Sequence, residues 1–397
     1  MSNDFPAAND PSARAADPAA IGTSAQPFIR PDLSEIPAYI PGKVIPGALK
    51  IASNEMSQPP LPSVSAAITE VLAEPTSSPN RYPDMGAVAL RTRIGQSLGL
   101  PLEQVAVGCG SSALCLQLIQ ATCRPGDEVV FPWRSFEAYP ILTQIAGATP
   151  RPVPLDEQGR NDLTAMAEAI TERTRLVFVC NPNNPTATTV GRQEFDDFLA
   201  AVPADVVVAL DEAYIELVDP DTRATTPLSD SLIAAHPNLV GLRTFSKVYG
   251  LAGLRVGYLF GSELLVEAVN KVAIPFSVNS VAQAAAIASL DAEAELAVRI
   301  KEVRDQRERV TAAINDATGY PTVLPGSQAN FVWIAESHIA DLGPLLADAS
   351  VTTTVELTAY LAERNIVIRG FHGEGARITI TTAEEATALL DALGVAT

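Results

Sequence analysis

The sequence predicts an α/β protein with a large domain, built on a mostly parallel sheet flanked by helices, and a smaller α+β domain after it. Two observations carry this prediction. Short β-branched runs alternate with longer Ala- and Leu-rich stretches up to about residue 275. The pattern then changes to one long charged helix followed by separate strand-like runs. A chain of 397 residues has room for about two or three domains.

Five apolar runs are expected to form the sheet of the large domain, because strands that are covered by helices on both faces are continuously apolar. The residues between them leave room for right-handed crossover units, which need roughly 30 residues each. The runs are QVAVG (104–108), DEVVF (127–131), RLVFVC (175–180), DVVVAL (205–210) and LVGLRTF (239–245).

The second part of the chain predicts a different architecture. The charged stretch 295–316 is expected to be a long helix. The expected strands are FVWI (331–334), IVIR (366–369) and ARITI (376–380). The predicted organisation is a disordered Ala-, Pro- and Asp-rich tail at 1–28, an arm at 29–49 that packs with the small domain or a dimer partner, the large domain at 50–275 and the small domain at 276–397.

Composition excludes several classes of protein. The net charge of −19 disfavours a nucleic-acid partner, because binding a phosphate backbone requires a basic face. The four cysteines lack C-x-x-C spacing and there are only three histidines, so no zinc site is predicted. Neither a signal peptide nor an apolar stretch of about 18 residues is visible. We expect a soluble cytoplasmic protein with no metal, whose cysteines are free thiols.

The run RTFSKVYGLAGLRVGY (243–258) places Lys247 directly after the last predicted strand. Strand ends in α/β proteins carry reactive groups, and burial lowers the pKa of a lysine amine so that it can attach covalently to a carbonyl. The hydroxyls of Thr244 and Ser246, together with Arg255, provide what a phosphate dianion requires. The pattern predicts a site for pyridoxal 5'-phosphate with Lys247 as its anchor.

A glycine turn after another predicted strand, QVAVG, also supports a phosphate site. QVAVG leads through Gly110, Ser111 and Ser112 into a helix start, so that backbone amides and the helix dipole face an anion. The same string matches the dinucleotide fingerprint G-x-G-x-x-A, but Asp127 and Glu128 precede the next strand instead of following it, where a ribose would need an acid. A simple N-cap is the other interpretation of the two serines.

Asp211 directly follows the apolar run VVVAL, where burying a carboxylate is energetically unfavourable unless it pairs with a cation. A protonated pyridine nitrogen would be that cation. Asp211 would keep this nitrogen protonated, so that the cofactor ring can act as an electron sink. A helix N-cap is the alternative interpretation of this residue.

Several segments of the chain, which occur in the family's order, resemble fold type I pyridoxal-phosphate-dependent aminotransferases. Among these, the chain most resembles the aromatic amino acid (phenylalanine) branch of the histidinol-phosphate aminotransferase family. The resemblance extends from about Arg30 to the C-terminus. It includes NRYPD (80–84), FVCNPNNPT (178–186), DEAY (211–214), RTFSKVYGLAGLRVGY (243–258) and SQANFVW (327–333).

The resemblance implies further cofactor contacts. It assigns Phe136 to stacking on the pyridine ring and Asn184 and Tyr214 to hydrogen bonds with the phenolic oxygen of the cofactor. Tyr82 would reach the cofactor phosphate of a neighbouring subunit, which implies a homodimer with shared active sites. Without the resemblance, Phe136 reads as a core aromatic residue and Asn184 as a turn residue.

The resemblance also implies substrate contacts. Arg377 matches the arginine that binds the substrate carboxylate, a contact that suits a planar guanidinium. Arg369 could share a substrate phosphate in histidinol-phosphate relatives, and a surface arginine is the other interpretation. Tyr39, Asn54 and Asn330 match positions that line relatives' active sites.

Two departures from the family pattern stand out. Met56 and Ser57 follow Asn54-Glu55 where the histidinol-phosphate group reads N-E-N-P, which weakens the histidinol-phosphate interpretation. Ala187 replaces the glycine of N-P-T-G, and the cofactor contacts assigned to Asn184 are expected to be retained.

The predicted function is a ping-pong transamination between phenylalanine, tyrosine or tryptophan and a 2-oxo acid such as 2-oxoglutarate, with Lys247 as general base and acid. Phe136, Tyr139 and Phe371 are expected to form the aromatic pocket. Three alternatives are histidinol-phosphate transamination, decarboxylation of an amino acid phosphate with the same cofactor, and a non-catalytic role. Retention of Lys247, Asp211 and Arg255 speaks against the last.

Overall fold

The structure is a computed structural model that describes residues 29–36, 45–75, 79–346 and 350–395. The chain divides into two compact units, Met1–Pro37 and Ala38–Thr397. In the first unit the described part contains a short 3-10 helix, η2 (Pro31–Glu35). The predicted tail at 1–28 and the candidate Tyr39 lie outside the described residues.

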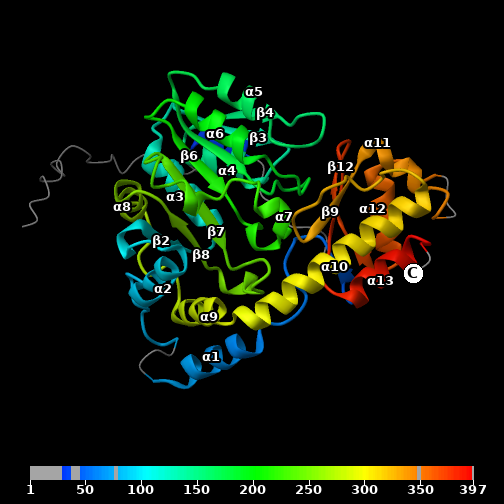
Figure 1. Ribbon diagram of the computed structural model, residues 1–397, viewed down its shortest axis with the longest axis horizontal. Helices are drawn as coiled ribbons and strands as arrows, with labels where there is room; N and C mark the ends of the chain where they lie inside the picture. The colour runs from blue at the N-terminus through cyan, green and yellow to red at the C-terminus, as the bar shows by residue number, and fades with distance from the viewer. Residues whose placement is uncertain (1–28, 37–44, 76–78, 347–349, 396–397) are drawn as a thin grey trace, which may run out of the picture. The chain divides into compact units, whose positions relative to one another are not determined.

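A seven-stranded sheet forms the centre of this unit, and its strand order is β2-β8-β7-β6-β5-β3-β4 (Figure 1). The pairs from β7 through β4 are parallel, and β8 runs antiparallel to both of its neighbours. The strands are β2 (Val105–Gly108), β3 (Glu128–Trp133), β4 (Thr149–Pro154), β5 (Thr174–Cys180), β6 (Val207–Asp211), β7 (Leu239–Thr244) and β8 (Gly257–Phe260). The mostly parallel α/β sheet predicted from the sequence is confirmed.

Helices cover both faces of the sheet, because alternate side chains of each strand point to opposite faces. Phe178 packs with the face that α3 and α4 cover, whereas its neighbours Val177 and Val179 belong to the opposite core. The helices of this part are α1 (Pro62–Ala73), α2 (Val88–Leu98), α3 (Ser111–Thr122), α4 (Ala138–Ile145), α5 (Leu163–Glu168), α6 (Arg192–Ala201), α7 (Pro220–Arg223), α8 (Glu263–Lys271) and α9 (Ser280–Asp291). Short 3-10 helices are η3 (Leu102–Gln104), η4 (Ile215–Leu217), η5 (Ser229–Ser231) and η6 (Ala252–Leu254).

Two strands of the seven-stranded sheet were not expected from the sequence. Strand β4 carries prolines at 150, 152 and 154, and it lies at the edge of the sheet, where a missing N–H is tolerated. Strand β8 has only four residues and begins with a glycine. It inserts between β2 and β7, and so brings the end of β7 close to the turn that follows β2.

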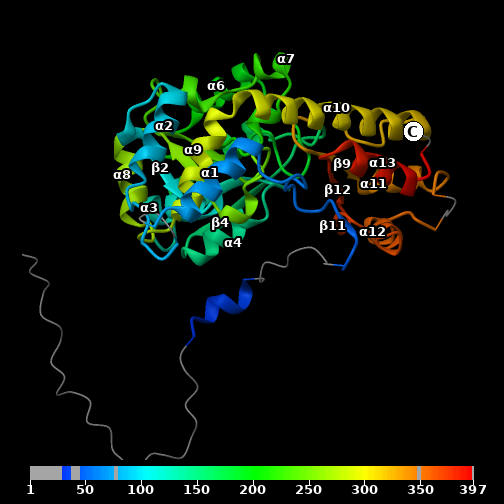
Figure 2. The ribbon, with the colours of Figure 1, turned by 90° about the horizontal axis from the view of Figure 1, so that it is seen from below.

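The C-terminal part has a separate apolar core of its own. Helix α10 leads to it from the side of α9, as both views show (Figures 1 and 2). Strands β9 (Phe331–Ala335), β11 (Arg369–Phe371) and β12 (Gly375–Thr379) form an antiparallel sheet, while β1 (Leu49–Lys50) pairs with β10 (Ile366–Val367). Helices here are α10 (Glu293–Thr318), α11 (Glu336–Ile339), α12 (Thr354–Glu363) and α13 (Ala383–Ala392), with the 3-10 helix η7 (Ala340–Leu342).

The run IVIR, predicted as one strand, is divided between two sheets. Its first two residues pair with β1, and Arg369 pairs with Arg377 on β12. This division places Arg369 in the β11–β12 pairing, where it lines a cavity, instead of continuing the first pairing. No helix within the described ranges is long and apolar enough to cross a membrane.

Candidate active site

The carboxyl ends of β5, β6 and β7 meet the start of α3, the start of α4 and the hairpin β11–β12 around a cavity of about 410 Å³. This is the edge at which α/β sheets bind ligands. Most of the site residues predicted from the sequence line the cavity: Asn54, Ser111, Ser112, Phe136, Asn184, Asp211, Tyr214, Thr244, Ser246, Lys247, Arg255, Arg369 and Arg377.

Lys247 provides the amine of the site. Burial lowers the pKa of Lys247 to about 8, and the guanidinium groups of Arg377 and Arg255 act in the same direction. Its Nζ atom lies 5.3 Å from the centre of the Tyr214 ring. Among the described residues none accepts a hydrogen bond from Nζ. A partly neutral amine without a fixed partner can act as a nucleophile or a base near neutral pH.

A cradle for an anion lies at the start of α3. Gly110 precedes the helix with φ of +76°, and a Cβ atom there would collide with the guanidinium of Arg255. A Cβ on Gly257 would lie 2.6 Å from the backbone nitrogen of Ser111. Glycine at both positions therefore lets β8, Arg255 and the helix N-terminus approach each other.

Hydroxyl groups complete the cradle. Thr244 Oγ1 donates to Ser246 Oγ at 3.0 Å, and Arg255 Nη1 donates to the same oxygen at 3.3 Å. Because Ser246 Oγ accepts twice, its own proton is left to donate to an anion in the cavity. Helix amides, a hydroxyl and a guanidinium are the donors that a phosphate dianion requires, so these residues fit the phosphate of pyridoxal phosphate.

Asp211 provides the carboxylate of the site. It is 3% exposed at the end of β6, and burial raises its pKa to about 6. Two donors oppose this rise: Tyr139 Oη donates to Oδ2 at 2.7 Å and the Ala213 N–H donates to Oδ1 at 3.2 Å. A buried carboxylate that is held ionised by neutral donors fits a cationic partner such as a protonated pyridine nitrogen.

The predicted aromatic pocket requires a correction. Phe136 lines the cavity, but Tyr139 and Phe371 do not. Tyr139 stacks on Phe178 behind the cavity, with ring centres 4.5 Å apart, and its hydroxyl is committed to Asp211. Instead Ile141 and Leu142 line the cavity. Helical periodicity could have predicted which residues line the cavity, because residues 138, 141 and 142 share one face of α4 and Tyr139 lies on another.

We expect Tyr139→Phe to lower kcat/KM for phenylalanine, the donor predicted from the sequence, by about tenfold at pH 6 and about threefold at pH 8. Loss of the hydroxyl donor raises the pKa of Asp211 further, so the carboxylate is more protonated at the lower pH. The pH profile of kcat/KM measures this. Tyr360→Phe is the control, because Tyr360 Oη donates to Leu346 O away from the cavity. A uniform loss at all pH values would contradict the assignment.

A hydrogen-bond network connects β12, the turn after β5 and the segment around residues 52–54 at the cavity. Arg377 Nη1 donates to Asn184 Oδ1, and Nη2 donates to Ala52 O at 2.6 Å. Asn54 Nδ2 donates to the Tyr214 hydroxyl oxygen at 3.0 Å. Arg377 is only 6% exposed, so its guanidinium is held in one orientation at the cavity wall.

Other candidates lie outside the cavity wall. Asn330 Nδ2 donates to Asn54 O at 3.1 Å, so Asn330 fixes the backbone of Asn54 without lining the cavity itself. Thr379, which sequence reasoning missed, donates to Asn54 Oδ1 at 3.0 Å. Tyr82 is 84% exposed and packs on Phe276, with ring centres 4.7 Å apart.

Ala187 occupies a left-handed backbone position, with φ of +60°. This conformation favours glycine, which the family pattern has at this position. The Asn183 carbonyl accepts from the Ala187 N–H at 2.7 Å, so the turn beside Asn184 is still closed.

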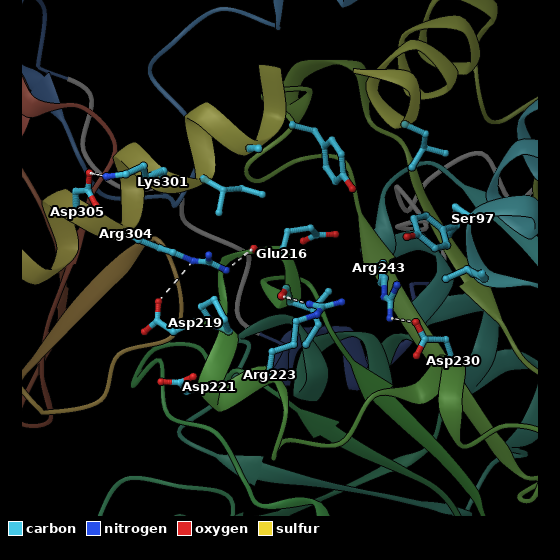
Figure 3. A pocket seen from close by; sticks show the side chains of 18 of the residues that line it. Ser97, Glu216, Asp219, Asp221, Arg223, Asp230, Arg243, Lys301, Arg304 and Asp305 are labelled. Atoms are coloured by element: carbon cyan, nitrogen blue, oxygen red, sulfur yellow. Dashed lines mark hydrogen bonds and ion pairs between the residues drawn. The ribbon is translucent and has the colours of Figure 1, made fainter. Parts of the chain in front are cut away.

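A second cavity, of about 890 Å³, lies between α10 and the segment that follows β6 (Figure 3). Six of its charged side chains form three ion pairs: Arg304 with Asp219, Arg243 with Asp230 and Lys301 with Asp305. Burial raises the pKa of Glu216 in its wall to about 7. None of the candidate site residues lines this cavity.

Comparison with known proteins places these features in a family. Residues 46–393 match the family model of aminotransferase class I and II. An aromatic amino acid aminotransferase of Corynebacterium jeikeium (strain K411) is 55% identical over 370 residues, covering 92% of this chain and 93% of that protein. The enzyme of the same name from Corynebacterium glutamicum (strain R) is 53% identical over 365 residues, covering 92% and 98%.

Among solved structures, the histidinol-phosphate aminotransferase from Sinorhizobium meliloti in complex with pyridoxal-5'-phosphate has a TM-score of 0.79. It is 26% identical, and the match covers 94% of this chain and 98% of that one. The family match, the fold and the lysine-bearing cavity lead to one conclusion: the chain belongs to the class I and II aminotransferases.

Proposed function

We propose that this chain is a pyridoxal-phosphate-dependent aromatic amino acid aminotransferase that acts by a ping-pong mechanism on phenylalanine, tyrosine or tryptophan and a 2-oxo acid such as 2-oxoglutarate. The observation that carries the proposal is one cavity in which Lys247, Asp211 and the Ser246–Arg255 cradle lie together beside the apolar residues Ile141 and Leu142. Relatives at 53% and 55% identity bear the aromatic name, which supports the choice of donor.

Each group then has a task. Pyridoxal phosphate would be held by Lys247, by the cradle at the start of α3 and by Asp211, and when bound it supplies an electron sink next to the substrate α-carbon. The Lys247 amine would take the proton from the substrate α-carbon as general base and deliver it to the cofactor as general acid. Asp211 keeps the pyridine nitrogen protonated, and Arg377 binds the substrate carboxylate.

A cytoplasmic homodimer completes the proposal. Apolar side chains are exposed around Tyr82: Met85 is 64% exposed and Ile274 74%. Such side chains suit an interface with a second copy, from which Tyr82 would approach the partner's phosphate cradle. All four cysteines are free thiols, which is typical of proteins in a reducing compartment.

Arg377→Lys is expected to lower kcat/KM for phenylalanine by about 100-fold, mainly by raising KM, because an ammonium cannot make a bidentate contact with a carboxylate. Steady-state kinetics with phenylalanine measure the effect. Arg364→Lys is the matched control, since Arg364 is an exposed residue at the end of α12. An unchanged KM would show that Arg377 does not bind the substrate carboxylate.

The proposed function is tested by stopped-flow absorbance of the bound cofactor, with the enzyme mixed separately with phenylalanine and with histidinol phosphate. Much faster conversion by phenylalanine supports the aromatic assignment. Faster conversion by histidinol phosphate would make the chain a histidinol-phosphate aminotransferase. Release of carbon dioxide instead of a 2-oxo acid would indicate a decarboxylase.

A further inference from the structure

We propose that Asn54 and Thr379 position the hydroxyl proton of Tyr214, so that Tyr214 donates it into the cavity and, when pyridoxal phosphate is bound, to the phenolic oxygen of the cofactor. Asn54 is then a positioning residue and not a substrate contact. The inference rests on the proposed function, because it concerns a cofactor contact that this function requires.

Thr379 fixes the orientation of the Asn54 side chain. Thr379 Oγ1 accepts from the backbone N–H of Asn54 at 3.1 Å and donates to Asn54 Oδ1 at 3.0 Å. Asn54 is 1% exposed and Thr379 3%. Among the described residues Thr379 Oγ1 donates to no other acceptor, so turning the amide by 180° would leave its buried proton facing an NH2 group, which is unfavourable. The Asn54 NH2 group therefore points to Tyr214.

The amide in turn directs the proton of Tyr214. Asn54 Nδ2 donates to Tyr214 Oη at 3.0 Å, so this oxygen accepts on that side and its own proton points elsewhere. Burial raises the pKa of Tyr214 well above its ordinary value, so the proton is retained at neutral pH. None of the described residues accepts a hydrogen bond from Tyr214 Oη. Because Asn54 and Tyr214 both line the cavity, the proton is available to an acceptor inside it.

The ring of Tyr214 is already held in place, so the direction of the O–H bond is what remains to be fixed. The ring packs edge-on against Phe331, with ring centres 5.0 Å apart, and Lys247 Nζ lies 5.3 Å from its centre. The hydroxyl thus belongs to the part of the cavity that holds the proposed anchor of the cofactor. An O–H that donates to an anionic oxygen stabilises the anion, so a directed proton lowers the pH at which the bound cofactor is deprotonated.

The backbone of Asn54 permits a clean substitution. Its φ of +61° is left-handed, a conformation that asparagine tolerates and glycine adopts without strain. Asn54→Gly therefore removes the amide without straining the chain. Thr379→Val keeps the shape of the threonine and removes the hydroxyl that orients Asn54. Neither substitution changes the charge of the cavity.

A purely structural role is the alternative, because the contact between Asn54 and Thr379 joins two distant segments of the chain. Ser57 and Thr381 join the same two segments, with a hydrogen bond of 2.7 Å between their hydroxyl oxygens. Neither of them lines the cavity. Thr381→Val is therefore a matched control, which weakens the same connection and leaves the hydrogen bond to Tyr214 in place.

The test is a pH titration of the cofactor-loaded protein, followed by the visible absorbance of the bound pyridoxal phosphate from about pH 5 to pH 10. We expect Asn54→Gly and Thr379→Val to raise the midpoint of the absorbance change by about one pH unit, because a hydrogen bond to the anionic form is lost. Thr379→Ser keeps the hydroxyl, so it and Thr381→Val should leave the midpoint within about 0.3 pH unit of the wild type.

A double variant tests whether the effect passes through Tyr214. Tyr214→Phe alone should raise the midpoint by about one pH unit or more, and adding Asn54→Gly to it should change the midpoint by less than about 0.3 pH unit. An unchanged midpoint in Asn54→Gly, an equal rise in Thr381→Val, or a full further rise in the double variant would overturn the proposal. A wild type that acquires no visible absorbance with pyridoxal phosphate would count against the proposed function itself, so the two failures are distinguishable.

Discussion

Replacing Lys247 by alanine is expected to lower kcat/KM for phenylalanine by at least about 10⁴-fold, because no other described side chain in the cavity offers an amine whose pKa is lowered to about 8. The cradle of Ser246 and Arg255 remains, so the variant should still bind pyridoxal phosphate. Steady-state kinetics measure the loss, and absorbance after gel filtration measures the retained cofactor.

Lys271→Ala provides the control for this variant. Lys271 pairs with Glu267 on the exposed face of α8, with Nζ and Oε1 2.7 Å apart, and it should keep full activity. Thermal unfolding of both variants separates loss of chemistry from loss of fold. If the Lys247→Ala enzyme retained more than about one hundredth of the activity, another group would have to move the α-proton.

Asp211→Asn is expected to have two opposite effects. It should lower kcat/KM by about 10³-fold or more, because an amide cannot hold the pyridine nitrogen protonated. It should also stabilise the cofactor-free protein at pH 8 by on the order of 2 to 3 kcal/mol, because it removes a buried carboxylate that has no cation hydrogen-bonded to it. Both effects have one cause: the buried carboxylate destabilises the cofactor-free protein but is needed for activity once the cofactor is bound.

The pH dependence of the stabilisation follows from the raised pKa. An unfolded chain loses the Asp211 proton near pH 4, whereas in the folded state the pKa is about 6. Between these values the folded state binds more protons, so the contribution of Asp211 to the free energy of unfolding falls as pH rises from about 4 to 6 and stays low above that. Urea unfolding of the cofactor-free wild type and Asp211→Asn at pH 4 and pH 8 tests this.

The difference between the two proteins should be small at pH 4 and largest at pH 8. A difference that does not depend on pH would mean that packing, not ionisation, separates the two proteins. Saturating pyridoxal phosphate supplies the missing cation, so it should stabilise the wild type more than the variant.

Local chemistry could be predicted from the sequence alone. The strands around β5, β6 and β7 were visible because their apolar runs are continuous. Lys247 and Asp211 were visible because a charged residue at the end of a buried strand requires a partner. Arg255 was visible because a phosphate dianion requires a cation beside the hydroxyls of Thr244 and Ser246. The turn at Gly110 was visible because its function depends on backbone geometry within a few residues. The sequence by itself thus determined the fold class and most of the residues that line the cavity at the strand ends.

Only the tertiary structure decided which distant parts of the chain meet at the cavity. Glu137 and Arg369 are 232 positions apart, and Thr379 and Asn54 are 325 apart. Tyr139 read as a pocket residue until the packing of α4 turned it toward Asp211. Such contacts depend on how two separately built cores meet, and neither propensity nor periodicity carries that information, since each describes only neighbours along the chain.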